Sequence, residues 1–274
     1  MSNLTKRLLT ALIGIPIVAV LTYLGDWWFV VLVAALVLDS QVEFYNMVSP
    51  RVSGRHLVTG LALGIVIVLK QYTGLDFLPI VLLLLIGLLV LDTFDTASEK
   101  NFNGFAWMAT GVVYPALLFS FAINLRHGWG DALTHHEGFL LIVGLLLIVW
   151  ATDSMAYFTG RAIGKTPLAP AISPKKTWEG TIGGFFGAVL VAILLKLYML
   201  PFLSWQDAII CALIGGIGGQ IGDLVESRLK RIYGVKDSGK ILPGHGGVLD
   251  RIDGLVLVIP LYYLYLAHFA AFAQ

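Results

Sequence analysis

The stretch "GFLLIVGLLLIVWATDSMAYFTG", residues 138–160, decides the fold class of this protein. Asp153 is its single charged side chain, and leucine, isoleucine and valine fill most of its first half. An apolar run of about 18 or more residues with few charges is typical of a helix that spans a membrane. Residues 138–160 therefore predict a transmembrane helix with one carboxylate late in the span.

The same pattern recurs along the whole chain, which is 58% hydrophobic and only 13% charged. The segments expected to span a membrane are roughly 8–25, 27–48, 57–75, 77–95, 104–125, 138–160, 181–203, 205–227 and 255–272. No polar stretch between them is long enough for an independent soluble domain. The sequence predicts an all-α, polytopic integral membrane protein of about nine transmembrane helices. Residues 1–274 are expected to form a single transmembrane catalytic domain.

The basic residues indicate which helix ends share a side of the membrane. If the N-terminus is cytoplasmic, the alternating spans place inside the segments 1–7, 49–56, 96–103, 161–180 and 228–254. These segments hold all but three of the 18 Lys and Arg residues, the exceptions being Lys70, Arg126 and Lys196. Cytoplasmic loops carry such an excess of basic residues. The distribution predicts a cytoplasmic N-terminus, in a cytoplasmic or inner membrane.

Carboxylates of the predicted spans gather near these same cytoplasmic ends. They are Asp39, Glu43, Asp92, Asp95, Asp153, Asp223 and Glu226. An ionisable residue within a membrane helix is costly, so it often marks a functional site. We expect Asp92 and Asp95 to be helix-end residues that reach water. Asp39 and Glu43 fit function and structural pairing equally well, whereas Asp153 and Asp223 border the two longest polar loops and are expected to be functional.

Glycines at a spacing of four occur in two of the later spans. Gly183 and Gly187 form one such pair, and Gly218 and Gly222 another. This spacing predicts close packing of helix backbones in lipid. Close packing at Gly222 would help to fix the adjacent carboxylate of Asp223.

The first long polar loop reads "GRAIGKTPLAPAISPKKTWEGT", residues 160–181. Its "GKT" at 164–166 is no P-loop, because three residues separate its glycine from the preceding one and the motif needs four. Ser173, Lys175 and Lys176 supply a hydroxyl and two ammonium groups just before a membrane helix. We expect the two lysines to bind phosphate, although they could also anchor the chain at lipid headgroups.

The second polar loop, 228–254, contains "KDSGKILPGHGGVLDRID" at residues 236–253. Its four glycines allow backbone conformations that other residues resist and let the chain approach a ligand closely. Asp250 and Asp253 are three residues apart at the start of the last helix, so they would leave it on one face. The donors around them are Lys236, Lys240, His245 and Arg251.

Carboxylates from a helix end and from this loop would repel one another if they met. Two such charges about 4 Å apart cost roughly 4 kcal/mol at an effective dielectric constant of 20, and a divalent cation removes that cost. Oxygen ligands without a Cys and His set favour Mg²⁺ over zinc. Mg²⁺ with Lys and Arg opposite suits a polyphosphate. The sequence therefore predicts a magnesium and phosphate site on the cytoplasmic side.

The second loop also carries a resemblance. From Ser227 to Asp253 the chain resembles the phosphatidate cytidylyltransferases, also called CDP-diacylglycerol synthases. The matching positions are Ser227, Leu229-Lys230-Arg231, Lys236-Asp237, Gly239, Leu242-Pro243, His245-Gly246-Gly247, Asp250-Arg251 and Asp253. The block "TDSMAYFTGRAIGKTPLAPAISPKKTWEG" from Thr152, and the early "KRLLTALIGIPIV", are similar to other parts of this family.

The resemblance implies that CTP and phosphatidic acid react to give CDP-diacylglycerol and pyrophosphate in phospholipid biosynthesis. It also implies dependence on Mg²⁺, a possible second, monovalent cation such as K⁺, and a homodimer in the membrane. Nothing indicates a nucleic-acid partner. By position, Asp223 and Asp250 match the metal-binding aspartates of the family.

The expected active site comprises loops 161–180 and 228–254 with the adjoining helix ends, and it faces the cytoplasm. Catalytic roles are expected for Asp223, Asp250, Asp253, Lys236 and Arg251. Substrate binding is expected for Ser173, Lys175, Lys176, Arg228, Lys230, Arg231, Lys240 and His245. Metal ligands are expected at Asp223, Asp250 and Asp153.

An alternative function is a membrane cation transporter with a carboxylate-lined path. Carboxylates within membrane helices also line ion paths. A transporter would need acidic residues deep in several helices and reachable from both sides. Here they gather on one side, next to long basic loops, which favours the enzyme.

Overall fold

The computed structural model describes residues 3–49, 51–94 and 100–273. Within these ranges, eight helical stretches are long and apolar enough to cross a membrane. A ninth, α4 (Leu78–Phe94), is apolar but shorter. Each of the nine predicted spans corresponds to one of these stretches, so the prediction of a polytopic helical membrane protein is confirmed. Asp95 and part of the predicted inward segment 96–103 lie outside the described residues.

The chain divides into two compact units, each built from two stretches of sequence. Unit 1 comprises Met1–Ile123 and Asp237–Arg251, and unit 2 comprises Asn124–Lys236 and Ile252–Gln274. Residues 237–251 of the second polar loop therefore fold with the N-terminal helices, although they follow most of unit 2 in the sequence. The expectation of a single catalytic domain stays a prediction.

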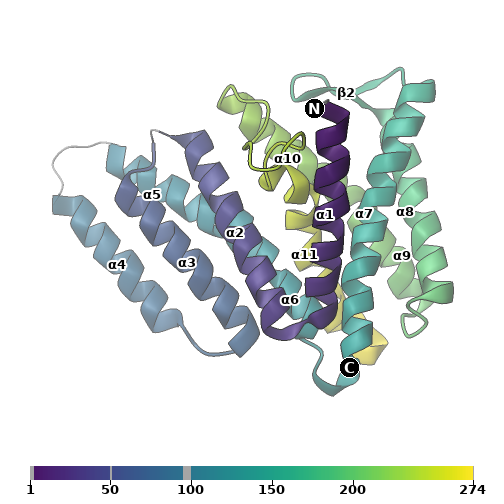
Figure 1. Cartoon of the computed structure of the whole chain (residues 1–274), viewed down its shortest axis with the longest axis horizontal. Coiled ribbons are helices and arrows are strands. Elements are labelled where there is room, and N and C mark those ends of the chain that lie inside the picture. Colours follow the sequence, from purple (N-terminus) through teal and green to yellow (C-terminus); the bar gives the residue numbers. More distant parts are fainter. Residues whose placement is uncertain (1–2, 50, 95–99, 274) are drawn as a thin grey trace. The chain divides into compact units, whose positions relative to one another are not determined.

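Unit 1 is a group of packed helices that runs through α2, α3 and α4 in turn (Figure 1). Its elements are α1 (Asn3–Leu24), α2 (Asp26–Val48), α3 (Gly54–Thr73), α4, α5 (Lys100–Gly111), the π-helix η1 (Val112–Leu118) and the start of α6 (Phe119–His127). Pro115 lies within η1, where the missing proline N–H disrupts regular α-helical bonding.

Buried polar side chains join the helices of unit 1. Nε2 of Gln41 donates to the carbonyls of Gly60 at 3.0 Å and Gly111 at 3.3 Å. Asp92, expected to reach water, lies instead against α3, where Oδ2 is 2.8 Å from Nε2 of His56. That expectation is wrong because a polar partner on the neighbouring helix replaces water.

Unit 2 contains the remaining helices and a short hairpin. Its elements are η2 (Gly130–Ala132), α7 (His135–Ile163), β1 (Pro167–Ala169), β2 (Ser173–Thr177), α8 (Trp178–Tyr198), α9 (Trp205–Leu213), η3 (Ile214–Gly218), α10 (Gly219–Ile232), most of α11 (Leu249–Phe269) and η4 (Ala271–Ala273). Figure 1 shows α7 and α8 running side by side. The antiparallel pair β1–β2 lies within the first predicted polar loop, which therefore has regular structure that the hydropathy pattern did not predict.

The predicted glycine pairs pack helices of unit 2 together. A Cβ at Gly183 would overlap the side chain of Thr159, and one at Gly187 would lie 2.6 Å from Cγ of Met155. A Cβ at Gly222 would come 2.6 Å from the carbonyl oxygen of Asp253. The packing role of these glycines is confirmed, and Gly222 brings α10 against α11 next to Asp223.

The second polar loop is shorter than predicted, because helix extends into it from both sides. α10 continues to Ile232, so Arg228, Lys230 and Arg231 are helical. α11 begins at Leu249 rather than at residue 255, so Asp250 and Asp253 lie in its first turns. The placement of Asp250 and Asp253 at the start of the last helix is confirmed, and both helices extend beyond the apolar spans because polar residues continue them.

Candidate active site

In unit 1, the backbone of the second polar loop closes around Asp250. Oδ2 of Asp250 accepts hydrogen bonds from the backbone N–H of Ser238 at 3.0 Å and of Gly247 at 2.8 Å. Gly246 adopts a φ of 86°, which favours glycine and allows the turn before α11. The loop thus fixes one oxygen of the carboxylate through its own backbone.

Glu43 of α2 holds this loop from the other side. Its buried carboxylate accepts from Oγ of Ser238 at 2.9 Å, from the N–H of Val248 at 3.0 Å and from the N–H of Leu249 at 2.9 Å. The sequence left Glu43 open between function and structural pairing. The signal that could have pointed to it is a glutamate late in an apolar span, near the predicted cytoplasmic end.

Helix α1 also contacts the loop. Nε of Arg7 donates to the carbonyl of Gly244 at 2.7 Å, and Oγ1 of Thr10 donates to the carbonyl of Pro243 at 3.1 Å. The start of α1, the end of α2 and the second loop therefore share one end of unit 1. This agrees with the predicted alternation of the spans.

Gly247 gives a direct test of this packing. A Cβ there would overlap both Oγ of Ser238 and the carboxylate of Glu43. We expect Gly247→Ala to lower the free energy of unfolding by about 1–3 kcal/mol, because overpacking forces neighbouring groups apart. The thermal unfolding midpoint of the purified protein in detergent measures this. Gly87→Ala is the control, since a Cβ on Gly87 meets nothing within 4 Å; an equal midpoint for the two variants would contradict the packing described.

In unit 2, three helices bring carboxylates into one neighbourhood. Asp223 lies on α10, Asp253 on α11 and Asp153 on α7. Asp253 lies close enough to interact electrostatically with the carboxylates of Asp223 and Asp153 and with the ammonium group of Lys230. These three aspartates were all predicted site residues, and the fold of unit 2 brings them together.

The β-hairpin supplies a cation to this group. Nζ of Lys176, on β2, lies 2.5 Å from Oδ2 of Asp223, while Oγ of Ser227 donates to Oδ1 at 3.1 Å. Successive strand residues point to opposite faces, and the neighbouring Lys175 is exposed. Lys176 was predicted to bind phosphate; in this structure its ammonium group pairs with the carboxylate of Asp223.

The "GKT" segment at 164–166 binds a carboxylate of its own chain. Glu179, in the first turn of α8, accepts from the backbone N–H of Lys165 at 3.1 Å and from the hydroxyl of Thr166 at 2.9 Å. Its role is therefore to tie the start of the hairpin to α8, which agrees with the rejection of a P-loop.

The other predicted donors differ in how they are placed. Lys230 is buried, and its ammonium group pairs with Glu226 one turn earlier on α10. Arg231 donates to the carbonyls of Ile172 at 3.3 Å and Val235 at 3.2 Å, tying the end of α10 to the hairpin. Exposed side chains are found at Arg228, Lys236, Lys240 and Arg251. His245 is half-buried, and Ser173 begins β2.

The donor set suits a hard divalent ion bound partly by substrate. Among the described residues, no three or more His, Cys, Asp or Glu side chains form a group able to hold a metal ion. Mg²⁺ does not need such a cage, because it is usually bound by one or two carboxylates with waters and phosphates. The carboxylate of Asp223 already takes a cation, the ammonium of Lys176. Asp250 belongs to unit 1, so the prediction that it shares an ion with Asp223 joins the two units and stays a prediction.

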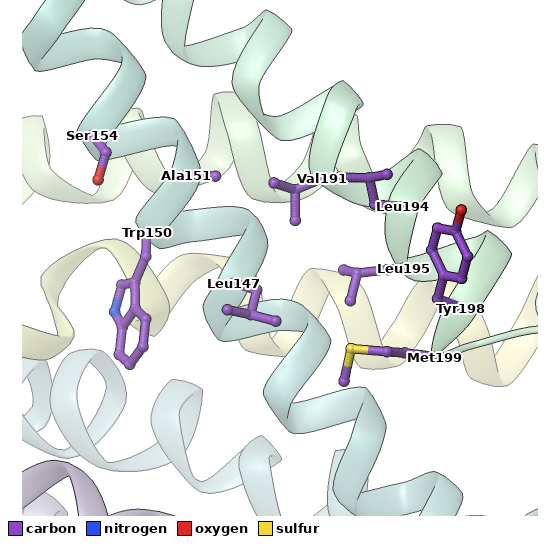
Figure 2. A pocket seen from close by; sticks show the side chains of 9 residues that line it. All are labelled: Leu147, Trp150, Ala151, Ser154, Val191, Leu194, Leu195, Tyr198 and Met199. Carbon is purple, nitrogen blue, oxygen red and sulfur yellow. The ribbon is translucent and has the colours of Figure 1, made fainter.

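A groove of about 470 Å³ runs between α7 and α8, and none of these carboxylates lines it. Figure 2 shows the nine side chains that line it. Most are hydrocarbon, such as Val191 and Leu194, and none is charged; the hydroxyls are those of Ser154 and Tyr198. Such a lining cannot compensate a phosphate, but it suits the hydrocarbon chain of a lipid.

Comparison with known proteins identifies relatives over nearly the whole chain. A sequence model described as "Cytidylyltransferase family" matches residues 5–269. Proteins named "Phosphatidate cytidylyltransferase" are similar to this chain. The one from Brucella abortus (biovar 1, strain 9-941) is 39% identical, covering 98% of this chain and 96% of its own. Those from Bacillus subtilis (strain 168) and Staphylococcus aureus (strain COL) are 32% and 37% identical, covering 98% and 93% of this chain and 100% and 96% of their own.

Proposed function

Because this chain belongs to the cytidylyltransferase family and makes CDP-diacylglycerol from CTP and phosphatidic acid, we propose that its aspartates Asp223, Asp250 and Asp253 carry the reaction together with Mg²⁺. The observation that carries this assignment for Asp223 and Asp253 is their gathering with Asp153 in unit 2, with a cation already on Asp223; for Asp250 it is the resemblance of residues 227–253 to the family. The transporter alternative finds no support in the relatives, which are named as transferases.

The reaction exchanges one phosphoanhydride bond for another. An oxygen of the phosphatidate phosphate attacks the α-phosphorus of CTP, a new P–O bond forms, and the bond to the β-phosphate breaks to release pyrophosphate. The attacking oxygen is already anionic, so no strong general base is needed. Catalysis then depends on positioning the two anionic substrates and on stabilising the charge that develops on them.

In this proposal the carboxylates would bind the metal ion, and the Lys and Arg side chains would bind the phosphates. Asp223 and Asp250 would hold Mg²⁺, which would neutralise charge on the triphosphate when bound. Asp253 and Asp153 would orient the ligands of that site. A Lys and Arg set would neutralise the phosphates, since charge-assisted hydrogen bonds to phosphate are strong. It comprises Lys236, Lys240 and Arg251 for the triphosphate, and Lys175, Lys176, Arg228 and Arg231 for pyrophosphate or the lipid phosphate.

Three predicted donors have subsidiary places in this proposal. Ser173 begins the strand that carries both hairpin lysines, so its hydroxyl would bind phosphate beside them. His245 lies in the loop next to Gly244 and Gly246, and would donate to a phosphate from there. Lys230 is buried beside Asp253, so its charge would act on the carboxylates of unit 2.

The protein is an integral membrane protein, and we propose that its active site faces the cytoplasm. The concentration of Lys and Arg in the predicted inward segments supports this orientation. CTP is a cytoplasmic metabolite, and a site on that side at the level of the headgroups would meet the phosphate of an inner-leaflet lipid. A homodimer and a second, monovalent cation such as K⁺ complete the proposal; the resemblance of residues 227–253 to this family suggests both.

A turnover assay with purified protein tests the function. In detergent micelles that contain phosphatidic acid, we expect CTP to be consumed with equal amounts of pyrophosphate and CDP-diacylglycerol formed. Omitting phosphatidic acid, or chelating Mg²⁺ with EDTA, should stop the reaction, and adding Mg²⁺ back should restore it. Turnover that persists without divalent ions would refute the metal assignment, and ion flux in liposomes without turnover would favour a transporter.

A further inference from the structure

The carboxylate of Glu43 makes its hydrogen bonds to a polar loop rather than to the helices beside α2. It lies on α2, yet all three donors to its carboxylate belong to the loop and the first turn of α11: Ser238, Val248 and Leu249. The N–H groups at the start of a helix have no partner within the helix. Glu43 therefore acts as a cap for α11 that comes from another helix, 206 residues away from Leu249 in the chain.

The loop is shaped to receive this carboxylate. A Cβ on Gly239 or on Gly247 would overlap the carboxylate oxygens of Glu43. Neither position has a φ in the left-handed region, so space rather than backbone conformation explains glycine here. Two loop glycines thus let the backbone close around Glu43, a role that sequence analysis had assigned to the approach of a ligand.

Ser238 links Glu43 to Asp250. Its hydroxyl donates to Glu43 at 2.9 Å and accepts from the backbone N–H of Asp250 at 3.3 Å. Its own backbone N–H donates to Oδ2 of Asp250 at 3.0 Å. Through Ser238 and the first turn of α11, Glu43 therefore fixes both the backbone and the side chain of Asp250.

We propose that Glu43 is a positioning residue, which orders the loop at 237–249 so that Asp250 is preorganised for its ion. This inference rests on the proposed role of Asp250. The three loop groups that contact residue 43 all donate, so they need acceptor oxygens there; the carboxyl of Asp39, one turn earlier on α2, also lies close enough to interact with the carboxylate of Glu43. An amide at this position would turn one acceptor into a donor that faces N–H and O–H groups, and a buried donor would lose its partner.

The variant Glu43→Gln tests the proposal without a change in side-chain size. In the purified protein without metal or CTP, we expect hydrogen exchange of the amides of Val248 and Leu249 to accelerate about tenfold or more. In the turnover assay we expect the Mg²⁺ concentration for half-maximal rate to rise, or kcat to fall, by roughly 10- to 100-fold, as is usual when the support of a metal ligand is removed. Glu43→Asp keeps the carboxylate and should recover part of the loss.

Gln41→Met is the matched control. Gln41 is also a buried polar residue of α2, but its hydrogen bonds go to Gly60, Gly111 and Tyr45 rather than to the loop. We expect this variant to shift the thermal midpoint while leaving the exchange of Val248 and Leu249 and the Mg²⁺ requirement as in the wild type. Equal effects of Gln41→Met and Glu43→Gln on these two readouts would overturn the positioning role.

Other outcomes are equally decisive. Unchanged exchange in Glu43→Gln, or faster exchange with unchanged turnover and Mg²⁺ requirement, would overturn the inference. If Glu43→Gln does not fold, Ser238→Ala removes one donor of the same network and should shift both readouts in the same direction by a smaller factor. Failure of the proposed function is distinguishable, because it would show as wild-type protein that lacks Mg²⁺-dependent turnover of CTP.

Discussion

Asp250→Asn is expected to lower kcat by roughly 1000-fold or more while the protein stays folded. The amide oxygen of the new side chain can take the place of Oδ2, which accepts from the N–H groups of Ser238 and Gly247. The loop would therefore keep its shape. What the change removes is the negative charge, and with it the proposed ligand for a divalent ion at the triphosphate.

Turnover of CTP and the thermal midpoint in detergent should be measured on the same preparation. Asp131→Asn is the control, because Asp131 is an exposed carboxylate on η2 that has no part in the proposed site. We expect it to behave as the wild type. If Asp250→Asn kept near-normal turnover that depends on Mg²⁺, Asp250 could not be a ligand of the catalytic ion.

Asp223→Asn is expected to have the second-largest effect, a loss of roughly 100- to 1000-fold in kcat. Its ion pair with Lys176 is partly exposed, with 26% and 35% of the two side chains accessible. Such pairs contribute about 1 kcal/mol or less to stability. The midpoint should therefore change little, because the amide oxygen can still accept from Ser227.

A charge exchange distinguishes a metal-ligand role of Asp223 from a role limited to its ion pair with Lys176. The double variant Lys176→Asp with Asp223→Lys restores an ion pair of opposite polarity between β2 and α10. We expect no recovery of turnover, because a carboxylate on the hairpin would not replace one beside Asp253. Recovery to within about tenfold of the wild type would mean that the ion pair itself, rather than a metal ligand, explains the need for Asp223.

Much of the candidate site follows from the sequence, and particular residues show where this stops. The carboxylates of Asp153, Asp223 and Asp253 were singled out because charges in apolar spans are costly, and unit 2 brings them together. Lys176 was predicted to bind phosphate, and the structure pairs it with Asp223. This pairing depends on the β1–β2 hairpin, whose strands of three and five residues are too short for a clear sequence pattern.

Glu43 and Asp92 show what the sequence could not predict. Each is a carboxylate near the end of an apolar helix, so hydropathy alone cannot distinguish them. One binds the loop around Asp250, and the other pairs with His56 on the adjacent helix. The difference lies entirely in which polar partner the packing brings near.

The sequence by itself determined that this chain is a polytopic helical membrane protein and which segments are its spans. It could do so because the backbone of a membrane span must satisfy its hydrogen bonds internally, so the length of an apolar run is enough to predict a helix. Tertiary structure alone decided that Glu43 caps α11 and that Ser238, 195 residues from Glu43 in the chain, links it to Asp250. Hydrogen bonds between such distant residues depend on how whole helices pack, and no local pattern in the chain encodes them.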